Sequence, residues 1–462
     1  MTQPPVTAPR QIPLPGIDRR PTKTGVDRQL RPQTNQAINT LLAQDTPAHD
    51  WYRFVLSFPP HLVRDYAERF DLGGDQTLLD PFCGTGTTLV EAKKLGIPSV
   101  GLEAMAVSRL AANTKVDWSP DPDLMESHAR LVAEKALARL AIDGIGDAPT
   151  PSPPHNGLLR SLRPETAKLL LKNSISPLPM HKVLILKEVL ENEQDSRFAT
   201  HEKLALARIL PTEVGNLRFG PEVGVGKIKR DAAVVGPWLD AVRSMSDDLH
   251  HLRFIDTTPA HALEGDARDV HRHLAPESID AVITSPPYPN EKDYSRTVRL
   301  ESVLLGYLND RADLQTAKKA LVRSNTRGVY RHDDDDAWVG ENEEVEHIAA
   351  AIESRRLALG KQSGFERTYH KVTRLYFGGM ARHFSSLSKV LRPGARLAYV
   401  VGDQASYLRI MIRTGRILAG IAEQTGYEVE GIDLFRTRQA TATKEQLREE
   451  VLLLRWPGPS RS

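Results

Sequence analysis

Residues 279–290 have the sequence Ile-Asp-Ala-Val-Ile-Thr-Ser-Pro-Pro-Tyr-Pro-Asn. The apolar run from Ala281 to Ile283 predicts a short buried strand. That strand must end near Ser285, because two consecutive prolines cannot donate hydrogen bonds to a sheet. A hydroxyl, a proline carbonyl and the ring of Tyr288 are therefore expected at the carboxyl end of a strand. Ligands bind at this edge in open α/β sheets, so we expect a functional site here.

The composition is that of an ordinary globular protein, with 462 residues, 40% hydrophobic, 26% charged and a formal net charge of +2. This length allows two or three domains, or one domain with large insertions. The charge gives no global signature for nucleic-acid binding, so any basic surface must be local. The single cysteine, Cys83, excludes an internal disulfide and a four-cysteine zinc site. No run of about 18 apolar residues is present, and we expect a cytoplasmic protein.

A second motif lies at residues 77–92, Thr-Leu-Leu-Asp-Pro-Phe-Cys-Gly-Thr-Gly-Thr-Thr-Leu-Val-Glu-Ala. It predicts a strand, a glycine turn and a helix, and residues 98–102 predict a second strand that ends at Glu103. Glycines let the backbone approach a ligand closely. An acid 19 residues after Gly84 is placed to accept hydrogen bonds from ribose hydroxyls. The third glycine of the dinucleotide fingerprint and the P-loop lysine are missing, which argues against NAD binding and against an ATPase.

The α/β pattern is interrupted twice. Residues 1–46 are rich in proline and basic, which predicts a disordered tail, with a basic arm on a phosphate backbone as the alternative. Residues 119–261 predict an inserted, mostly helical domain, and residues 301–376 a second helical insertion. Within the second insertion we interpret Asp333 to Asp336 as a solvated loop rather than a metal cluster. Seven strands are expected, around Leu78, Val100, Leu263, Val282, Leu397, Val429 and Leu452.

Together the two motifs resemble those of the S-adenosylmethionine-dependent DNA amino-methyltransferases, which methylate the exocyclic amine of cytosine at N(4) or of adenine at N(6). The resemblance implies a Rossmann-like class I methyltransferase fold. This is an α/β fold with a seven-stranded, mostly parallel sheet that has one antiparallel strand, here interrupted by two largely helical insertions. Residues 47–118 and 262–460 would form the discontinuous catalytic domain. Residues 119–261 would be the candidate for DNA target recognition.

The order of the motifs departs from the commonest arrangement in the enzymes that carry Ser-Pro-Pro-Tyr. The catalytic strand often comes first in those enzymes, whereas here the cofactor loop comes first and a large insertion follows it. The question of which insertion recognises the DNA sequence therefore stays open.

The resemblance also implies a role for each motif residue. Ser285, Pro286, Pro287 and Tyr288 would hold the target base. Glu103 would accept hydrogen bonds from the ribose hydroxyls of S-adenosyl-L-methionine and Asp266 from its adenine amine, while residues 54–60 would pack over its methionine end. The complete set of expected cofactor contacts is Asp80, Phe82, Cys83, Gly84, Thr85, Gly86, Glu103 and Asp266.

The chemistry expected of the Ser-Pro-Pro-Tyr segment follows from the exocyclic amine, whose lone pair is delocalised into the base. The Ser285 hydroxyl and the Pro286 carbonyl would accept its two hydrogens and favour a more tetrahedral nitrogen. Tyr288 would stack on a base taken out of the duplex. Orientation and charge placement then carry the rate, and no metal is required. Cys83 lies in the glycine turn, so we set aside attack at ring carbon five of cytosine and interpret it as a packed side chain.

Serine at the first motif position favours cytosine N(4) in the resembling family, with adenine N(6) in DNA as the alternative. An RNA enzyme that methylates the exocyclic amine of guanine is a second alternative, and a methyltransferase fold that binds nucleic acid without turnover is a third. The expected partner is double-stranded DNA, with Lys227, Lys229 and Arg230 as candidate phosphate contacts. A separate restriction or defence protein is left open as a further partner, because no nuclease motif is evident. No membrane contact is expected.

Overall fold

The computed structural model describes residues 45–53, 57–150, 158–220, 222–255, 258–289, 292–362, 364–439 and 446–459. The predicted disordered tail lies outside these residues except for Asp45 and Thr46. Residues 54–56, part of the segment expected over the methionine end of the cofactor, also lie outside them. No helix in the described ranges is long and apolar enough to cross a membrane.

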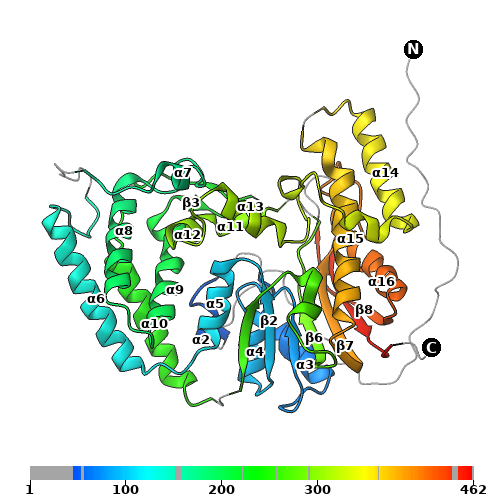
Figure 1. Cartoon of the computed structure of the whole chain (residues 1–462), viewed down its shortest axis with the longest axis horizontal. Coiled ribbons are helices and arrows are strands. Elements are labelled where there is room, and N and C mark those ends of the chain that lie inside the picture. The colour runs from blue at the N-terminus through cyan, green and yellow to red at the C-terminus, as the bar shows by residue number, and fades with distance from the viewer. Residues whose placement is uncertain are drawn as a thin grey trace.

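Seven strands form one sheet in the order β5-β2-β1-β6-β7-β9-β8 (Figure 1). Neighbouring strands run parallel except β9, which is antiparallel to both β7 and β8. Numbered along the chain, these seven strands have the order 3-2-1-4-5-7-6, with the seventh reversed. This is a Rossmann-like methyltransferase fold, as the motifs predicted. The strands are β1 (Leu78–Asp80), β2 (Ser99–Glu103), β5 (Ala260–Glu264), β6 (Ile279–Thr284), β7 (Leu391–Gly402), β8 (Glu428–Gln439) and β9 (Gln446–Arg455).

The central strands are buried on both faces, which explains why their sequences are continuous apolar runs. Successive side chains of a strand point to opposite faces, so Leu78 and Ala281 pack with α3 (Pro60–Arg69) and α4 (Thr87–Lys94). Their neighbours Leu79 and Val282 pack with the helices of the other face. Those helices are α15 (Tyr369–Leu387) and α16 (Thr414–Gln424), while α5 (Ala106–Val116) packs against β2 and β5 beside α4.

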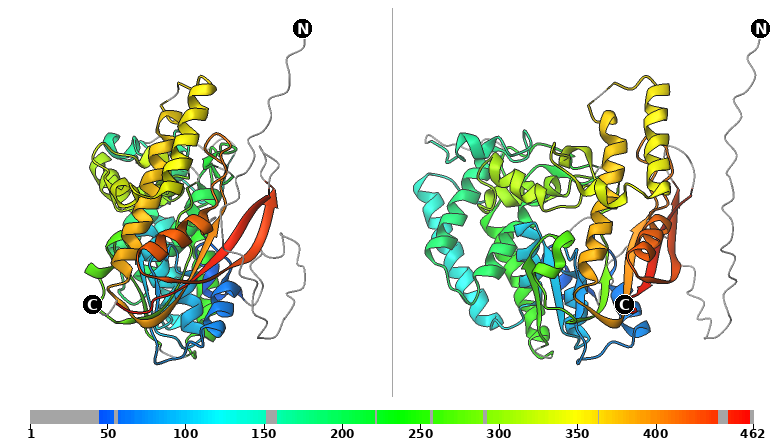
Figure 2. Two further views of the ribbon diagram at one scale, coloured as in Figure 1. Left: turned by 90° about the vertical axis from the view of Figure 1, so that its right-hand side faces the viewer. Right: turned by 45° about the vertical axis from the view of Figure 1, so that its right-hand side comes forward.

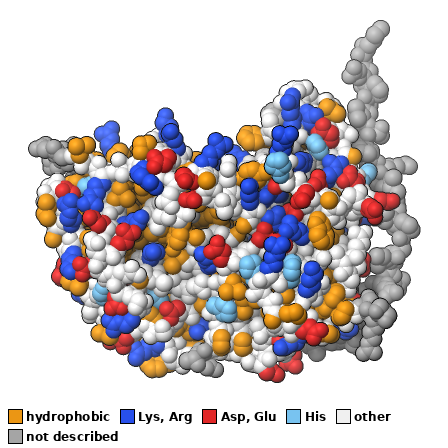
Figure 3. All heavy atoms as spheres, viewed as in Figure 1, with side chains coloured by type: hydrophobic (Ala, Val, Ile, Leu, Met, Phe, Trp, Pro, Cys, Tyr) orange, Lys and Arg blue, Asp and Glu red, His pale blue; other side chains and the backbone are white. Residues whose placement is uncertain are grey.

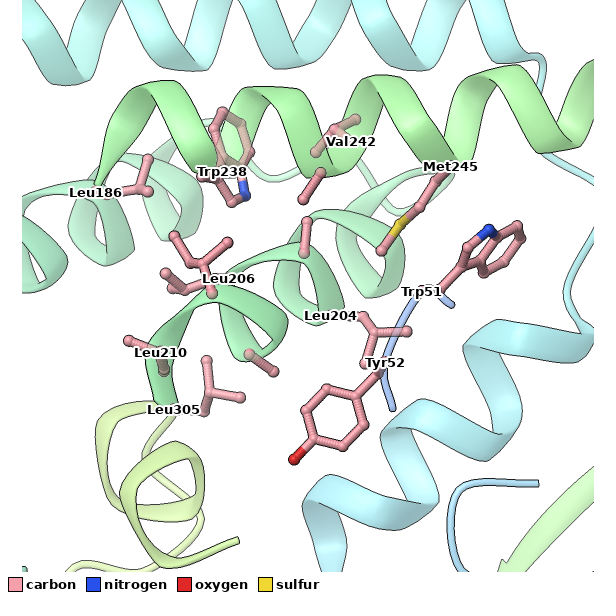
Figure 4. Packing of buried hydrophobic residues seen from close by; sticks show 14 of the residues in the cluster. Trp51, Tyr52, Leu186, Leu204, Leu206, Leu210, Trp238, Val242, Met245 and Leu305 are labelled. Atoms are coloured by element: carbon pink, nitrogen blue, oxygen red, sulfur yellow. The ribbon is translucent and has the colours of Figure 1, made fainter. Parts of the chain in front are cut away.

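The first insertion is a helical lobe whose apolar core is continuous with buried residues of α4 and α5, such as Leu89 and Val107. Trp238 lies at the centre of this core, and Trp51 and Tyr52 from the segment before α3 join it (Figure 4). Trp51 Nε1 also donates a hydrogen bond to Asp248 Oδ2 at 2.7 Å. The N-terminal segment thereby attaches the lobe to α4 and α5. The elements of the lobe are α6 (Pro122–Ile142), α7 (Pro164–Ala167), α8 (Pro177–Asn192), α9 (Ala199–Ile209), a π-turn (Leu210–Val214), α10 (Val235–Leu252) and the hairpin strands β3 (Leu217–Arg218) and β4 (Gly224–Val225).

The second insertion passes along the carboxyl edge of the sheet and then projects away from it. Figures 1 and 2 show α14 (Glu343–Ala358) and the start of α15 projecting beyond the rest of the molecule. Before them come α11 (Tyr294–Thr297), α12 (Arg299–Leu304) and α13 (Arg311–Lys319). This insertion therefore lies directly at the carboxyl edge of the sheet.

The interpretation of Asp333 to Asp336 as a solvated loop is wrong for Asp335. This side chain is buried, and its carboxylate binds Arg268 Nη1 at 2.5 Å and Arg382 Nη1 at 3.2 Å. Asp333 pairs with Arg323 at 2.9 Å. Within the described residues no group of three or more His, Cys, Asp or Glu side chains is arranged to hold a metal ion. Asp335 therefore fastens the second insertion to the sheet domain through Arg268 and Arg382, whereas Asp333 forms an ion pair within the insertion.

The contact between Asp335 and α15 depends on Gly378. A Cβ at Gly378 would lie 1.8 Å from the Asp335 carbonyl oxygen, whereas the atom nearest to a Cβ at Gly379 would be Val322 Cγ1 at 3.3 Å, followed by Asp335 Oδ2 at 3.5 Å. We expect Gly378→Ala to lower the free energy of unfolding by about 1–3 kcal/mol through overpacking, despite the better helix propensity of alanine. Thermal unfolding measures this change, with Gly379→Ala as the matched control. Equal stability of the two variants would contradict the packing described here.

Candidate active site

A cavity of about 890 Å³ lies at the carboxyl edge of the sheet. It is lined by residues 81–85 after β1, residues 103–105 after β2, Gly265 and Ala267 after β5, and residues 285–288 after β6. The strand order reverses between β1 and β6, which is the point where ligands bind in such sheets. The volume lies within the roughly 300–1,000 Å³ of small-molecule sites. The two motifs, about 200 residues apart in sequence, therefore line one cavity.

Asp80 lies behind the cavity and connects its two halves. Its Oδ2 accepts a hydrogen bond from Thr88 Oγ1 at 2.6 Å, and its Oδ1 accepts from Thr284 Oγ1 at 2.5 Å and from the Phe82 N–H at 3.0 Å. Burial raises the pKa of Asp80 to about 6, although these three donors oppose the increase. The side chain is not part of the cavity lining, so it positions the glycine turn and strand β6 relative to each other.

The glycine turn needs both of its glycines. Gly84 and Gly86 have φ angles of 52° and 87°, in the left-handed region that disfavours side chains. A Cβ at Gly86 would also lie 2.9 Å from the Cα of Ala112 in α5. Gly84 lines the cavity with Phe82, Cys83 and Thr85, whereas Gly86 is not in the lining and supports the turn from α5. The Cys83 thiol is buried, and burial raises its pKa well above the usual range, which fits a packed side chain.

Glu103 lines the cavity at the end of β2, as expected. Its Oε1 accepts a hydrogen bond from the Met105 N–H at 2.6 Å, which fixes the carboxylate at the rim of the sheet. Burial raises the pKa of Glu103 to about 7, opposed by backbone N–H groups of Met105, Gly84 and Ala104. A carboxylate that is held in this way and faces a cavity fits an acceptor for the two hydroxyls of a ribose.

Asp266, like Asp80 and Gly86, is a predicted cofactor residue that lies outside the cavity lining. Its neighbours Gly265 and Ala267 line the cavity, but Asp266 itself does not. Its carboxylate accepts hydrogen bonds from Arg268 Nε at 3.0 Å and Nη2 at 2.5 Å, and from the Arg268 N–H at 2.9 Å. The expected contact between Asp266 and an adenine amine stays a prediction.

The Ser-Pro-Pro-Tyr segment lines the cavity with all four of its residues. Ser285 Oγ donates to the Val400 carbonyl at 3.2 Å, which leaves its lone pairs as acceptors. The Tyr288 ring packs over the backbone of β7, because a Cβ at Gly402 would lie 3.0 Å from Tyr288 Cε2. Burial and the nearby Glu449 raise the pKa of Tyr288, so its phenol stays neutral. The Ser-Pro-Pro-Tyr end of the cavity therefore has oriented acceptors and an aromatic ring without a charged group in the motif itself.

Several lining residues lie outside both motifs, and the sequence analysis missed them. Lys318 Nζ binds Asp293 Oδ2 at 3.0 Å and the Arg327 carbonyl at 3.1 Å, so two segments of the second insertion meet at the cavity. The only sequence signal was the closeness of Asp293 to the Ser-Pro-Pro-Tyr motif. The missed lining residues include His49, Tyr52, Arg53, Ser108, Lys115, Asp293, Tyr294, Lys318, Arg323, Ser324 and Asn325.

The three predicted phosphate contacts lie at or beside the β3–β4 hairpin and outside the cavity lining. Lys227 and Arg230 are exposed. Lys229 Nζ instead donates to the carbonyls of Thr212 at 2.5 Å, Glu213 at 3.1 Å and Gly215 at 2.6 Å, and so closes the end of the π-turn. Lys227 and Arg230 therefore remain as candidate phosphate contacts.

Charges of both signs are interspersed on the face shown in Figure 3, in keeping with the small net charge. The hairpin is nevertheless tied to the rim of the cavity. Glu222 Oε2 lies 3.4 Å from Arg327 Nη1 in the second insertion and 4.0 Å from Arg296 Nη1 in α11, just before that insertion. A long polymer that reached the cavity would therefore pass close to both insertions.

Comparison with known proteins finds sequence relatives among type II methyltransferases. No family model matches the chain. The sequence is 24% identical over 425 residues to the type II methyltransferase M.BsoBI of Geobacillus stearothermophilus, covering 86% of this chain and 82% of that protein. It is 23% identical over 423 residues to the type II methyltransferase M.AvaI of Anabaena variabilis, covering 86% and 83%. The resemblance predicted from the two motifs is confirmed.

Solved structures add little to the fold assignment. TTHA0409 of Thermus thermophilus, assigned as a DNA modification methylase, gives a TM-score of 0.22 at 15% identity over 43% of this chain and 54% of that chain. TrmN from Thermus thermophilus gives 0.25 at 10% identity over 89% and 52%. This chain thus spans about half of those two proteins. The fold is assigned from the strand order of the sheet instead.

The role of Asp80 can be tested at Thr284. Thr284→Val keeps the side-chain shape but removes a donor to a buried carboxylate, so we expect the free energy of unfolding to fall by about 1.5–3 kcal/mol. Thr284→Ser retains the hydroxyl and should remain close to the parent protein. Thermal unfolding with and without S-adenosyl-L-methionine measures the effect on both stability and ligand binding. If valine and serine behave alike, the hydrogen bond to Asp80 does not hold the two motifs together.

Proposed function

We propose that the protein is a DNA methyltransferase that transfers a methyl group from S-adenosyl-L-methionine to the exocyclic amine of a base, most favourably cytosine N(4). The observation that carries this proposal is the shared cavity, in which the glycine turn with Glu103 and the Ser-Pro-Pro-Tyr segment line one space of about 890 Å³. Similarity to two type II methyltransferases over 86% of the chain supports DNA as the substrate.

The cofactor end of the cavity fits S-adenosyl-L-methionine. This cofactor supplies an electrophilic methyl group on a sulfonium. Glu103, held by the Met105 N–H, would accept hydrogen bonds from the ribose hydroxyls. The glycine turn lets the backbone of residues 82–85 approach the ligand closely, since Gly84 has no side chain to intervene.

At the other end of the cavity, Ser285 and Pro286 would orient the amine of the target base. The hydroxyl and the carbonyl would accept its two hydrogens, so that the nitrogen lone pair turns toward the methyl group. Because the Tyr288 ring is supported from below by Gly402, it would offer a fixed face for stacking. A base inside a duplex cannot reach this buried edge, so the proposal includes extrusion of the target nucleotide. Orientation and electrostatics would supply the rate.

The choice of base rests on Ser285, because serine at this position favours cytosine in the resembling family. Adenine N(6) keeps the same geometry and is the alternative. Methylation of guanine in RNA and nucleic-acid binding without turnover use the same fold and are rivals. A separate restriction protein as partner is part of the proposal only because the relatives are type II methyltransferases.

The deciding experiment incubates the purified protein with tritiated S-adenosyl-L-methionine and unmethylated duplex DNA, followed by nucleoside mass spectrometry. N(4)-methylcytosine is the expected product. N(6)-methyladenine would retain the mechanism and change the base. Label in RNA alone would overturn the DNA assignment. If S-adenosyl-L-methionine binds but no nucleic acid is labelled, the protein is a binding module.

We predict that Ser285→Ala lowers the rate of methyl transfer by about 10²-fold or more, because one oriented group at the reacting atom is lost. The dissociation constant for S-adenosyl-L-methionine should change little. Ser278→Ala is the matched control, since its hydroxyl donates to the Ala275 carbonyl at 2.7 Å and lies outside the cavity lining. A Ser285→Ala, Tyr288→Ala double variant that retained the parent rate would show the catalytic assignment to be wrong.

The hairpin supplies a separate prediction for DNA affinity. Neutralising Lys227 and Arg230 with glutamine should weaken binding and flatten the dependence of log affinity on log salt by up to about 0.9 per phosphate contact. Titrations of labelled duplex at several salt concentrations measure the slope. Lys229→Gln should instead lower the unfolding temperature, because it removes donors from three carbonyls. An unchanged slope in the Lys227, Arg230 variant would remove the hairpin from the DNA interface.

A further inference from the structure

Lys115 is a buried lysine that faces a cavity instead of an opposite charge. It lies near the end of α5, its side chain is 3% exposed, and it lines the cavity. Within the described part of the chain, its ammonium forms no hydrogen bond or ion pair. Asp50, the acid whose charge acts on Lys115, is itself paired with Arg208 at 3.4 Å. Burying a cation without an opposite charge costs free energy, so the presence of a lysine at this position calls for an explanation.

The other buried lysines of the described residues show what a satisfied ammonium looks like in this protein. Lys182 Nζ binds Asp231 Oδ1 at 2.7 Å and the carbonyls of Asp147 at 3.0 Å and Ala232 at 3.2 Å. Lys318 binds Asp293 Oδ2 and a carbonyl. Lys115 is buried as deeply as these two, but the space before it is a ligand cavity instead of a carboxylate.

The surroundings of Lys115 favour an anion. Arg53 lines the same cavity and adds a second positive charge close enough to oppose protonation of Lys115. Burial lowers the pKa of Lys115 to about 7, with Arg53 also lowering it and Asp50 opposing them. Thr87, the first residue of α4, lies in the lining as well, and the positive end of that helix favours negative charge. An anion bound here would favour the protonated, charged form of Lys115.

The position of Lys115 in the cavity indicates which anion it would bind. Lys115 is the tenth residue of α5, which begins just after Glu103 at the edge of the sheet, and a helical side chain leans back toward the amino end of its helix. Residues 57–60, the described part of the segment expected over the methionine end of the cofactor, line the same cavity. S-adenosyl-L-methionine has a ribose for Glu103 and one anionic group, the carboxylate of its amino-acid end.

We propose that Lys115, with Arg53 beside it, binds the amino-acid carboxylate of S-adenosyl-L-methionine. This inference rests on the proposed function, because it assumes that this cofactor enters the cavity. It adds a residue that no motif contains. The carboxylate would complete the ion pair that Lys115 lacks within the described residues, so the protein would discriminate in favour of adenosyl ligands that carry an amino-acid carboxylate.

The test compares two ligands by isothermal titration calorimetry on the full chain, S-adenosyl-L-methionine and decarboxylated S-adenosylmethionine. We expect Lys115→Met to weaken binding of the first by about 10- to 100-fold, the effect of losing one charge-assisted hydrogen bond. Binding of the decarboxylated ligand should stay within about threefold of the parent value, because that ligand has no carboxylate to lose.

Lys94→Met is the matched control, since it makes the same change of charge on the neighbouring helix α4 at a residue outside the cavity lining. It should leave the preference for the carboxylated ligand intact. Lys115→Met should fold at least as well as the parent, because it removes a buried charge that no acid neutralises at close range. Lys115→Gln is the second variant should methionine prove unstable.

The possible outcomes separate this inference from the proposed function. If the parent binds no S-adenosyl-L-methionine, the proposed function fails first. If the parent binds it and Lys115→Met binds both ligands as the parent does, the inference fails alone. Equal weakening of both ligands would also overturn it, since the effect would then be independent of the carboxylate. A loss of DNA affinity with unchanged cofactor binding would assign Lys115 to a DNA phosphate and overturn it as well.

Discussion

The site depends on one buried carboxylate. Asp80 accepts hydrogen bonds from the helix that follows the glycine turn and from the last residue of strand β6. Both contacts are short, and both donors are threonine hydroxyls in regular elements, so neither can be lost without moving an element. The glycine turn and the Ser-Pro-Pro-Tyr segment are therefore held at a fixed separation. For a transfer between two ligands, that separation is the quantity the fold has to control.

The walls of the cavity are joined in the same way by the segment before α3. His49 Nε2 lies 2.7 Å from Glu91 Oε1 on α4, and the Tyr52 hydroxyl donates to Glu301 Oε1 on α12 at 2.7 Å. All four side chains are buried. This segment thus connects the cofactor side of the sheet with the second insertion. Burial lowers the pKa of His49 to about 4, so the link to Glu91 does not depend on a charged imidazole near neutral pH.

The sequence predicted those parts of the molecule that follow from local pattern. Each of the seven expected strand positions, from Leu78 to Leu452, lies in a strand of the sheet. Apolar runs bounded by turns are sufficient for this, because a parallel sheet buries both faces of its strands. The Ser-Pro-Pro-Tyr segment and the glycine turn could be placed at one edge because parallel strands end on the same side.

What could not be predicted depends on partners far away in the sequence. Asp335 looks like part of a solvated acidic run until Arg268 and Arg382 are brought next to it by the fold. Lys229 looks like a free cation in a basic loop until the carbonyls at the end of the π-turn surround it. No sequence pattern indicates that Lys115 is buried, since a lysine in an amphipathic helix is usually exposed. The charge of a residue is visible in the sequence, but its partner is not.

The interrupted sheet has a consequence for the synthesis of the protein. Strand β1 ends at residue 80 and its neighbour β6 begins at residue 279, so about 200 residues separate two strands that pair directly. At roughly 5–20 residues per second, a ribosome needs about 10–40 s to supply the missing partner. During that time β1 exposes one unpaired edge, whereas the helical lobe between them can form from local contacts. The lobe can therefore fold before β6 is available to pair with β1. In that interval the unpaired edge of β1 leaves the nascent chain open to aggregation.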